Sequence, residues 1–282
     1  MSGMLVVVGT PIGNLNDLSP RAESALRECD FIAAEDTRVT MKLLNHLSLK
    51  KPMVSYFEHN KHERGSAICD RMERGETCAI VTDAGMPCIS DPGEQLVAQC
   101  AERGIPVTVV PGPSALIAAL AVSGLPTGRF TFEGFLSVVK KQRTAHLESL
   151  RGEQRTMIFY EAPHKLVATL HDLADTFGPD RRVALVRELT KLHEEVFRTT
   201  LSGALDRYDG ENAAAPRGEF VLVVEGAAEA PEAARTWTAE EAAALACRLR
   251  DEEGISASEA AKRAAAQTGC RKSEIYAAMN AK

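Results

Sequence analysis

Residues 4–26 read MLVVVGTPIGNLNDLSPRAESAL: an apolar run of strand type, a turn that contains Gly9 and Gly13, and then a helical pattern. A buried strand that leads through such a turn into a helix is typical of α/β proteins that hold a cofactor or phosphate against the backbone. This turn lacks the G-x-G-x-x-G spacing of dinucleotide sites and the Gly-Lys-Ser/Thr of phosphate loops. Pro11 also removes a backbone donor that a pyrophosphate would need. A NAD-type or ATP-type site is therefore unsupported, and a plain strand-to-helix turn is an equal alternative.

The alternation that begins there continues to about residue 125. Apolar runs separated by helical patterns predict a parallel sheet with helices on both faces. The predicted strands are Met4–Gly9, Phe31–Glu35, Pro52–Tyr56, Cys78–Thr82 and Val107–Val110, and the predicted helices are Pro20–Glu28, Thr40–His46, Arg64–Arg74 and Gly93–Arg103. Ligands of such sheets bind at the carboxyl ends of the strands. Those ends carry GTPIGN, EDTR, FEHN, TDAGMPCISDPG and VPGPSAL, so we expect the functional site among these segments.

A second α/β set follows in the chain. Its predicted strands are Phe130–Phe135, Thr156–Glu161, Val183–Arg187, Glu195–Thr200 and Glu219–Glu225. They alternate more and include an adjacent antiparallel pair, which predicts a mixed sheet. We therefore expect two α/β domains, residues 1–120 and 121–226, with a small-molecule cleft between them.

The composition changes again at residue 227. Residues 227–236 are rich in Ala, Glu and Pro and are typical of a linker. Residues 237–282 predict three short helices, the last two with helix-turn-helix proportions. Thr238 and Ser256 each precede a Glu by three residues, which is the spacing of a capping box. Acidic and basic residues balance in this part, so a docking bundle is as well supported as a nucleic-acid reader, and we expect no DNA binding.

The composition of the whole chain, 45% hydrophobic and 26% charged, is that of a globular protein. No apolar run reaches the ~18 residues of a membrane span, and no signal peptide is evident, so we expect a cytoplasmic protein without a membrane partner. Seven cysteines without a C-x-x-C pair indicate reduced thiols. His59, His62 and Glu63 match no known metal triad, so we expect no metal. The net charge of −6 argues against nucleic-acid binding by bulk charge but leaves a local basic face open.

Two further segments at strand ends are rich in Gly and Pro. In VTDAGMPCISDPG (81–93) Asp83 follows a buried strand, and in VVPGPSAL (109–116) Ser114 opens an apolar helix. Together with GTPIGNL and AAEDTR, in this order and spacing, they resemble the tetrapyrrole methylase superfamily, whose members bind S-adenosylmethionine (SAM). FEHN, FEGF, YEAPH, RELTKLHEE and RGEFVLVVEG make the chain most similar to the ribosomal RNA small-subunit methyltransferases of that superfamily. The resemblance spans residues 4–226, and the C-terminal helices resemble the helix-turn-helix tail of the same branch.

The chain departs from the porphyrinoid-methylating members at two places. Those members carry Gly-x-Gly-x-Gly-Asp in the first turn and Gly-Asp-Pro in the third loop, where this chain has GTPIGN and Gly-Met-Pro. Neither Asp17 nor Asp91 occupies the missing position. The departure disfavours a tetrapyrrole substrate and fits the RNA branch. A methylase of a corrin or porphyrin precursor remains the alternative within the fold, and a non-enzymatic nucleoside sensor that binds nucleic acid is the alternative of another class.

The resemblance implies a homodimer of two α/β domains with SAM folded in the cleft between them. The reaction it implies is methylation of a cytidine 2′-hydroxyl, at cytidine 1402, in 16S rRNA of the small ribosomal (30S) subunit. Matching positions imply SAM contacts from Gly85, Met86, Pro87, Ile89, Ser114, Ala115, Tyr160 and Phe220. A helix start and core packing are the alternative roles for the small and the aromatic members of this set.

A ribose hydroxyl is a poor nucleophile, so a general base near it would help. The carboxylates at strand ends are the candidates, Glu35, Asp36 and Glu161, beside Glu58, His59 and His164. Salt bridges and ordinary hydrogen bonds are the alternative roles, and nothing in the sequence favours one candidate.

An RNA substrate also needs cations along the path of its phosphates. Lys140, Lys141 and Arg143 follow the FEGF segment near the inferred cleft, and Arg38 follows a strand end in EDTR. A solvated surface is the alternative for each, because most runs of charge have no partner.

Overall fold

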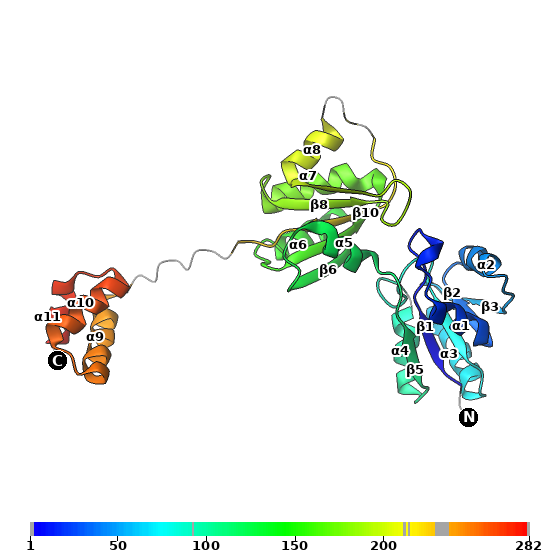
Figure 1. Ribbon diagram of the computed structural model, residues 1–282, viewed down its shortest axis with the longest axis horizontal. Helices are drawn as coiled ribbons and strands as arrows, with labels where there is room; N and C mark the ends of the chain where they lie inside the picture. The colour runs from blue at the N-terminus through cyan, green and yellow to red at the C-terminus, as the bar shows by residue number, and fades with distance from the viewer. Residues whose placement is uncertain (1–2, 92, 211–212, 214, 229–236, 281–282) are drawn as a thin grey trace. The chain divides into compact units, whose positions relative to one another are not determined.

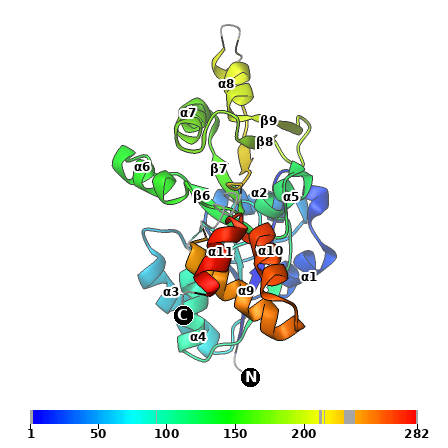
Figure 2. The same ribbon diagram turned by 90° about the vertical axis from the view of Figure 1, so that its left-hand side faces the viewer.

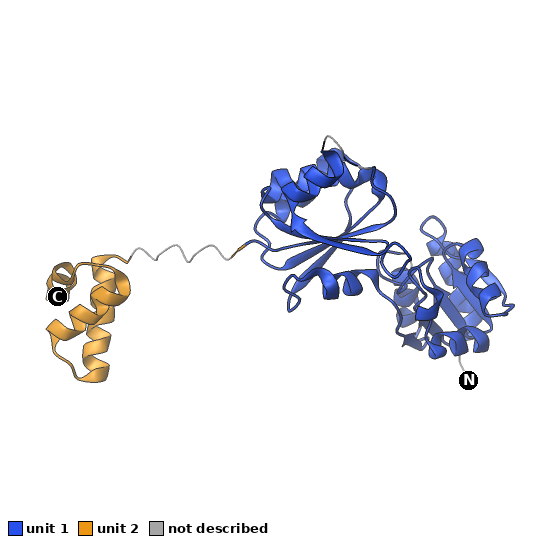
Figure 3. Cartoon of the chain, turned by 45° about the horizontal axis from the view of Figure 1, so that its top comes forward, with its two compact units in different colours: residues 1–227 blue, residues 228–282 orange. Residues whose placement is uncertain are grey.

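The computed structural model describes residues 3–91, 93–210, 213, 215–228 and 237–280. The chain divides into two compact units, residues 1–227 and 228–282 (Figure 3). Most of the linker expected at 227–236 lies outside the described residues. The described part of the first unit contains two five-stranded sheets (Figure 1).

The first sheet is parallel throughout, as predicted. Its strand order is β3 (Met53–Ser55), β2 (Phe31–Ala34), β4 (Cys78–Val81), β1 (Leu5–Val8) and β5 (Val107–Val110). The inner strands β1, β2 and β4 are buried along their length, because helices pack on both faces. One face is covered by α1 (Pro20–Glu28) and α2 (Thr37–His46), and the other by α3 (Lys61–Glu73) and α4 (Gly93–Glu102). All five strand ends that were expected to carry the site therefore meet at one edge.

Two helices of this sheet begin earlier than predicted. The prediction for α2 began at Thr40, where apolar spacing starts, but the helix begins at Thr37. Asp36 caps it, because its carboxylate accepts a hydrogen bond from the Arg38 N–H at 2.8 Å. Likewise α3 begins at Lys61 instead of Arg64. Apolar periodicity gives no signal for a first turn made of polar residues, so both predicted starts were wrong by one turn.

The second sheet is mixed, which confirms the prediction. Its order is β6 (Phe130–Phe135), β7 (Thr156–Glu161), β10 (Phe220–Val224), β8 (Arg182–Arg187) and β9 (Glu195–Thr200). Only β6 and β7 pair in parallel, and the remaining pairs are antiparallel. The helix α5 (Ala115–Ser123) packs on one face, and α7 (Leu166–Phe177) and α8 (Leu201–Asp209) cover the other (Figure 1). A further helix, α6 (Lys140–Ser149), adds Leu147 to the core on the face that α7 and α8 cover.

The second unit consists of α9 (Ala239–Glu253), α10 (Ala257–Thr268) and α11 (Lys272–Met279), which pack together as Figure 2 shows. Six alanines and Ile275 form the buried part of its core. The predicted capping box at Thr238 is complete. At Ser256 only the bond from the Glu259 N–H to the serine hydroxyl forms, at 3.3 Å.

Two expectations concerned membranes and metals. Within the described ranges, no helix combines the length and apolar character needed to cross a bilayer. Among the same residues, no group of three or more His, Cys, Asp and Glu side chains is arranged to hold a metal ion. The expectation that the protein works without a metal stays a prediction.

Candidate functional site

The turn after β1 packs against both of the glycine- and proline-rich loops. A Cβ on Gly9 would lie 2.6 Å from the Cα of Gly112, closer than real Cβ atoms approach. The Thr10 N–H donates to the Gly85 carbonyl at 2.9 Å, and the Gly85 N–H donates back at 3.2 Å. The glycine at position 9 is thus required by a close backbone contact. The turn therefore joins the two loops to each other.

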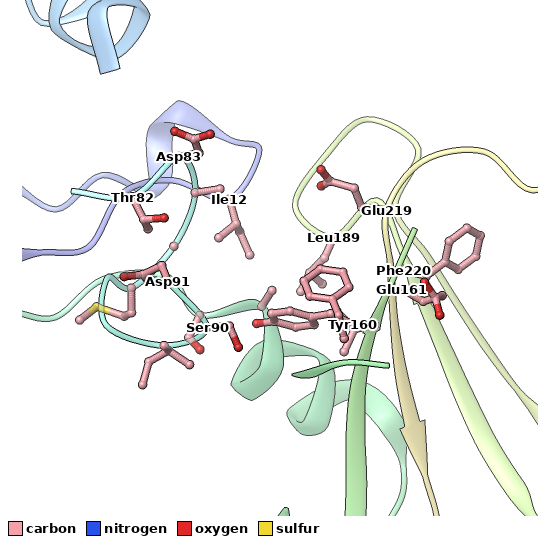
Figure 4. A pocket seen from close by; sticks show the side chains of 18 of the residues that line it. Ile12, Thr82, Asp83, Ser90, Asp91, Tyr160, Glu161, Leu189, Glu219 and Phe220 are labelled. Carbon is pink, nitrogen blue, oxygen red and sulfur yellow. The ribbon is translucent and has the colours of Figure 1, made fainter. Parts of the chain in front are cut away.

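A cavity of about 530 Å³ opens beside these loops. Its walls come from the segment 82–91, the start of α5, and the ends of β7, β8 and β10 (Figure 4). The two sheets thus face one ligand-sized space, since small-molecule sites commonly have volumes of ~300–1,000 Å³.

Most of the predicted site residues line this one cavity. Those that do are Glu35, Gly85, Met86, Ile89, Ser114, Ala115, Tyr160, Glu161 and Phe220. Pro87 is buried and lines a different, apolar groove beside β5. Asp36, Arg38, Lys140, Lys141 and Arg143 are not among the residues that line the cavity. The structure thus brings together predicted residues from the ends of five strands, and their binding roles stay predictions.

The loop that forms one wall has an unusual backbone. Gly85 has φ +90°, and the non-glycine residues Cys88 and Ser90 have φ +72° and +64°. Non-glycine residues in the left-handed region are uncommon and cluster at functional sites. Asp91 holds the loop in shape, because its Oδ1 accepts hydrogen bonds from the Cys88 and Gly93 N–H groups, both at 2.8 Å. Its Oδ2 is buried without a hydrogen-bond partner among the described residues, and burial raises the pKa of this carboxyl.

Tyr160 connects the second sheet to α5. Its hydroxyl accepts a hydrogen bond from the Leu116 N–H at 3.1 Å, which satisfies one of the free donors at the helix start. The rings of Phe132 and Phe135 meet Tyr160 edge-on, with centroids 4.9 Å and 5.5 Å away. Phe135 nevertheless remains 61% exposed and lines the cavity. Aromatic surface is therefore available to a planar ligand.

Carboxylates are the charged side chains among the described residues that line the cavity. Five acidic residues contribute, Glu35, Asp83, Asp91, Glu161 and Glu219, and none of the described residues that line it is Lys, Arg or His. Figure 4 shows Asp83 and Asp91 on one side and Glu219 and Glu161 on the other. Such a site favours a cationic ligand and opposes a phosphate. The residues present therefore fit the sulfonium and adenosine of SAM better than a nucleotide cofactor.

The three predicted catalytic carboxylates have different surroundings. Glu35 accepts a hydrogen bond from the Thr82 hydroxyl at 2.6 Å. Hydrogen bonds from Arg38 lower the pKa of Asp36 to about 2, and its carboxylate caps α2. Glu161 is 4% exposed, and both of its oxygens accept hydrogen bonds, one from the Ala162 N–H at 2.8 Å and one from the Thr169 hydroxyl. Of the two that line the cavity, Glu35 is the one with an oxygen, Oε1, that accepts no hydrogen bond from a described residue.

Asp83 is a further carboxylate at the cavity that was not among the predicted catalytic residues. Its Oδ1 accepts a hydrogen bond from the Asp36 N–H at 3.1 Å. Partial desolvation, with the negative charge of Glu35 added to it, raises the pKa of the Asp83 carboxyl. Its place directly after a buried strand in the quoted segment was the signal that could have marked it.

The predicted RNA-binding cations divide into two groups. The Arg38 side chain is 88% exposed but forms an ion pair with Asp36 at 2.5 Å, and Lys140 and Lys141 are exposed at the first two positions of α6. A lysine at a helix N-terminus opposes the helix dipole, so this position does not stabilise the helix. Arg143 is 11% exposed and forms an ion pair with Asp172 at 2.5 Å. Its guanidinium is therefore already engaged.

The sequence profile of the family "Tetrapyrrole (Corrin/Porphyrin) Methylases" matches residues 4–205. A protein of Synechocystis named ribosomal RNA small subunit methyltransferase I is 46% identical over 280 residues, which cover 97% of this chain and 96% of that protein. A protein of Thermotoga maritima with the same name is 49% identical over 224 residues, which cover 79% of this chain and 99% of that protein. Nearly the whole Thermotoga protein thus matches about four fifths of this chain.

Solved structures with the same fold include two more distant proteins. The uroporphyrin-III C-methyltransferase of Thermus thermophilus, complexed with S-adenyl homocysteine, has a TM-score of 0.53 at 20% identity, covering 78% of this chain and 97% of that one. A diphthine synthase has a TM-score of 0.58 at 14% identity, covering 79% and 90%. These likenesses concern the two-sheet fold alone. From the profile match and the close relatives together, the chain belongs to the tetrapyrrole methylase family, and within it to the group named ribosomal RNA small subunit methyltransferase I.

Proposed function

We propose that this chain is a SAM-dependent methyltransferase that acts on the 2′-hydroxyl of a cytidine ribose, cytidine 1402, in 16S rRNA of the 30S subunit. The observation that carries the proposal is the cavity of about 530 Å³ whose acidic lining includes no Lys, Arg or His among the described residues. SAM would supply a methyl group made reactive by a sulfonium. The carboxylates would favour that cation, and Gly85, Met86, Ile89, Ser114, Ala115, Tyr160 and Phe220 would hold the rest of the molecule. This proposed site does not include Pro87.

Methylation of a hydroxyl releases one proton, so a base beside the acceptor oxygen assists the reaction. We assign this role to Asp83, with Glu35 as its neighbour. Partial desolvation and the negative charge of Glu35 raise the pKa of the Asp83 carboxyl, which makes it a better proton acceptor than an ordinary aspartate. Asp36 would position the Asp83 carboxylate through the hydrogen bond that its N–H donates to it. Glu161 would fix the cavity wall around Tyr160.

The RNA path would run over the exposed cations Arg38, Lys140 and Lys141. A 30S particle is the substrate we propose, because assembled RNA is recognised largely by shape and backbone. An enzyme that modifies ribosomal subunits would work in the cytoplasm, where those subunits are made.

We also propose that two copies associate through the apolar surface beside β5. Val107 and Val109 on this edge strand are 39% and 50% exposed, and Ile89 and Ile117 beside them are 50% and 49% exposed. Exposed apolar edges favour association with another chain. Light scattering should give a dimer for the native chain and a monomer for Val109→Lys. A native monomer at micromolar concentration would refute this interface.

The decisive test is mass mapping of 16S rRNA from a strain that lacks this gene. We expect the loss of one cytidine ribose methyl, and its return when 30S particles are treated with the purified chain and labelled SAM. Full retention of every ribose methyl would refute the proposal. Methyl transfer to a precorrin but not to 30S particles would favour the tetrapyrrole alternative, and SAM binding without any transfer would favour the sensor.

A further inference from the structure

A second, smaller cavity adjoins the first one. It has a volume of about 170 Å³ and lies between the turn after β1, the helix α2 and the end of β4. Its walls include the aliphatic side chains of Val39, Leu43 and Val81. Drug-sized ligands occupy ~300–1,000 Å³, so a cavity of this size suits a single small ring.

One polar group inside these walls has no partner. Thr40 is 3% exposed and lines the cavity, and its Oγ1 has no hydrogen-bond partner among the described residues. A buried hydroxyl without a partner is unfavourable, so such groups are normally satisfied by protein, water or a ligand. The hydroxyls of Thr10 and Thr82 also line the cavity but already donate hydrogen bonds within the protein. A partly aliphatic slot with one unpartnered hydroxyl matches a flat heterocycle that has polar atoms on its edge.

The two cavities share a wall. Thr82 and Asp83 line both of them, and Figure 4 shows these two side chains where they border the larger cavity. A ring held in the small cavity would therefore place whatever is attached to it near Asp83. For a nucleotide, the attached group is the ribose, which carries the hydroxyl to be methylated.

Lys42 is the cation among the described residues that line the small cavity, and Asp83 is the carboxylate. Lys42 is exposed, and no hydrogen bond or ion pair joins Lys42 to another described residue. Arg38 lies four residues earlier on the same face of α2, where it forms an ion pair with Asp36. Lys42 therefore suits a phosphate that flanks a nucleotide in single-stranded RNA.

From these observations we propose that the cavity around Thr40 binds the pyrimidine base of the acceptor nucleotide, while its ribose lies at the Thr82–Asp83 wall. The proposal rests on the function proposed above and adds the place of the base. Thr40 is a positioning residue in it, because its hydroxyl would bond the base and not the reacting atoms.

The test compares two threonines whose buried hydroxyls both lack a hydrogen-bond partner among the described residues. Thr131 on β6 also has a buried Oγ1 without a partner, and it does not line this cavity. Thr40→Val and Thr131→Val each replace a hydroxyl by a methyl of equal size, so both variants should melt within a few degrees of the native chain. For methylation of 30S particles, kcat/KM should fall about tenfold in Thr40→Val, the value of one lost hydrogen bond to the base, and stay unchanged in Thr131→Val. Calorimetric affinity for SAM should be the same in both.

A second variant fills the space. Thr40→Leu should reduce methylation at least a hundredfold while SAM still binds, because the ring no longer fits. If Thr40→Leu does not fold, the comparison of the two valine variants alone decides. Equal kcat/KM in Thr40→Val and Thr131→Val would overturn the base pocket while leaving the proposed function standing. A native chain that cannot methylate 30S particles would overturn the proposed function and, with it, the pocket.

Discussion

Replacing Gly9 by alanine should disrupt the contact that joins the first turn to the other loops. The new Cβ would lie 2.6 Å from the Cα of Gly112 and 2.7 Å from its N. Both are backbone atoms, which cannot rotate away, so the two turns must separate. Overpacking of this kind lowers the free energy of unfolding by ~1–3 kcal/mol. Alanine also restricts the unfolded chain more than glycine does, and this loss of unfolded-state entropy raises the free energy of unfolding by ~0.4–1 kcal/mol. We expect a net loss of about 1–2 kcal/mol in the free energy of unfolding.

Urea unfolding measures this loss. With a slope of ~3 kcal/mol/M, the midpoint followed by far-ultraviolet circular dichroism should fall by ~0.3–0.7 M. The chain's one tryptophan, Trp237, lies in the second unit, so its fluorescence serves as an internal reference that should not move. Gly128→Ala is the matched control, because a Cβ there meets nothing within 4 Å and its φ is not positive.

The same contact can be probed from its other side. A Cβ on Gly112 would lie 2.8 Å from the Cα of Gly9, so Gly112→Ala should destabilise to a similar degree. The two changes disturb one contact, and their effects should therefore sum to more than the effect of the double variant. If Gly9→Ala unfolds at the same urea concentration as Gly128→Ala, the close approach of the two turns is refuted.

Three other perturbations test the site. Gly85→Val puts a β-branched side chain at φ +90°, with its Cβ 3.3 Å from Ile12. The affinity for SAM measured by calorimetry should therefore fall at least tenfold, and an unchanged affinity would refute the cofactor role of this loop. Replacing Lys140 and Lys141 together by Glu should lower methylation of 30S particles at least tenfold without changing SAM affinity, and unchanged turnover would remove them from the RNA path. The pKa of Asp36 is about 2 in the folded chain, below its ordinary value of 3.8, so its stabilising effect is present above about pH 4 and disappears as the pH falls through about 2. The urea midpoints of native and Asp36→Ala chains should therefore differ at pH 5 and converge near pH 2, and a constant difference would contradict the assigned cause.

The sequence predicted the two sheets because strand composition and helix spacing are local signals. Strands β5, β6, β7 and β9 have their predicted bounds. The polar first turns of α2 and α3 were missed, because apolar periodicity gives no signal for a polar turn, and α2 in addition starts at a cap, Asp36, that lies before its apolar spacing.

The site was predictable to the level of its loops but not of its side chains. Carboxyl ends of parallel strands meet at one edge whatever their sequence, so the loops could be expected to gather. Which side chains face the cavity depends on the positive φ angles of Gly85, Cys88 and Ser90, and these turn Pro87 to the other side. Arg143 is engaged by Asp172, a partner 29 positions along the chain that no local pattern reveals.

The small side chains in the core of the second unit have a consequence for how the chain responds to heat. Alanine buries far less apolar surface than leucine or phenylalanine, and the larger side chains Leu245, Leu249 and Ile255 are only partly buried against the six alanines and Ile275, so this core contributes little hydrophobic free energy. The three C-terminal helices should melt first, leaving the two-sheet body and its cavity intact over an interval of temperature. A chain built this way can lose or exchange its C-terminal appendage without rebuilding the rest.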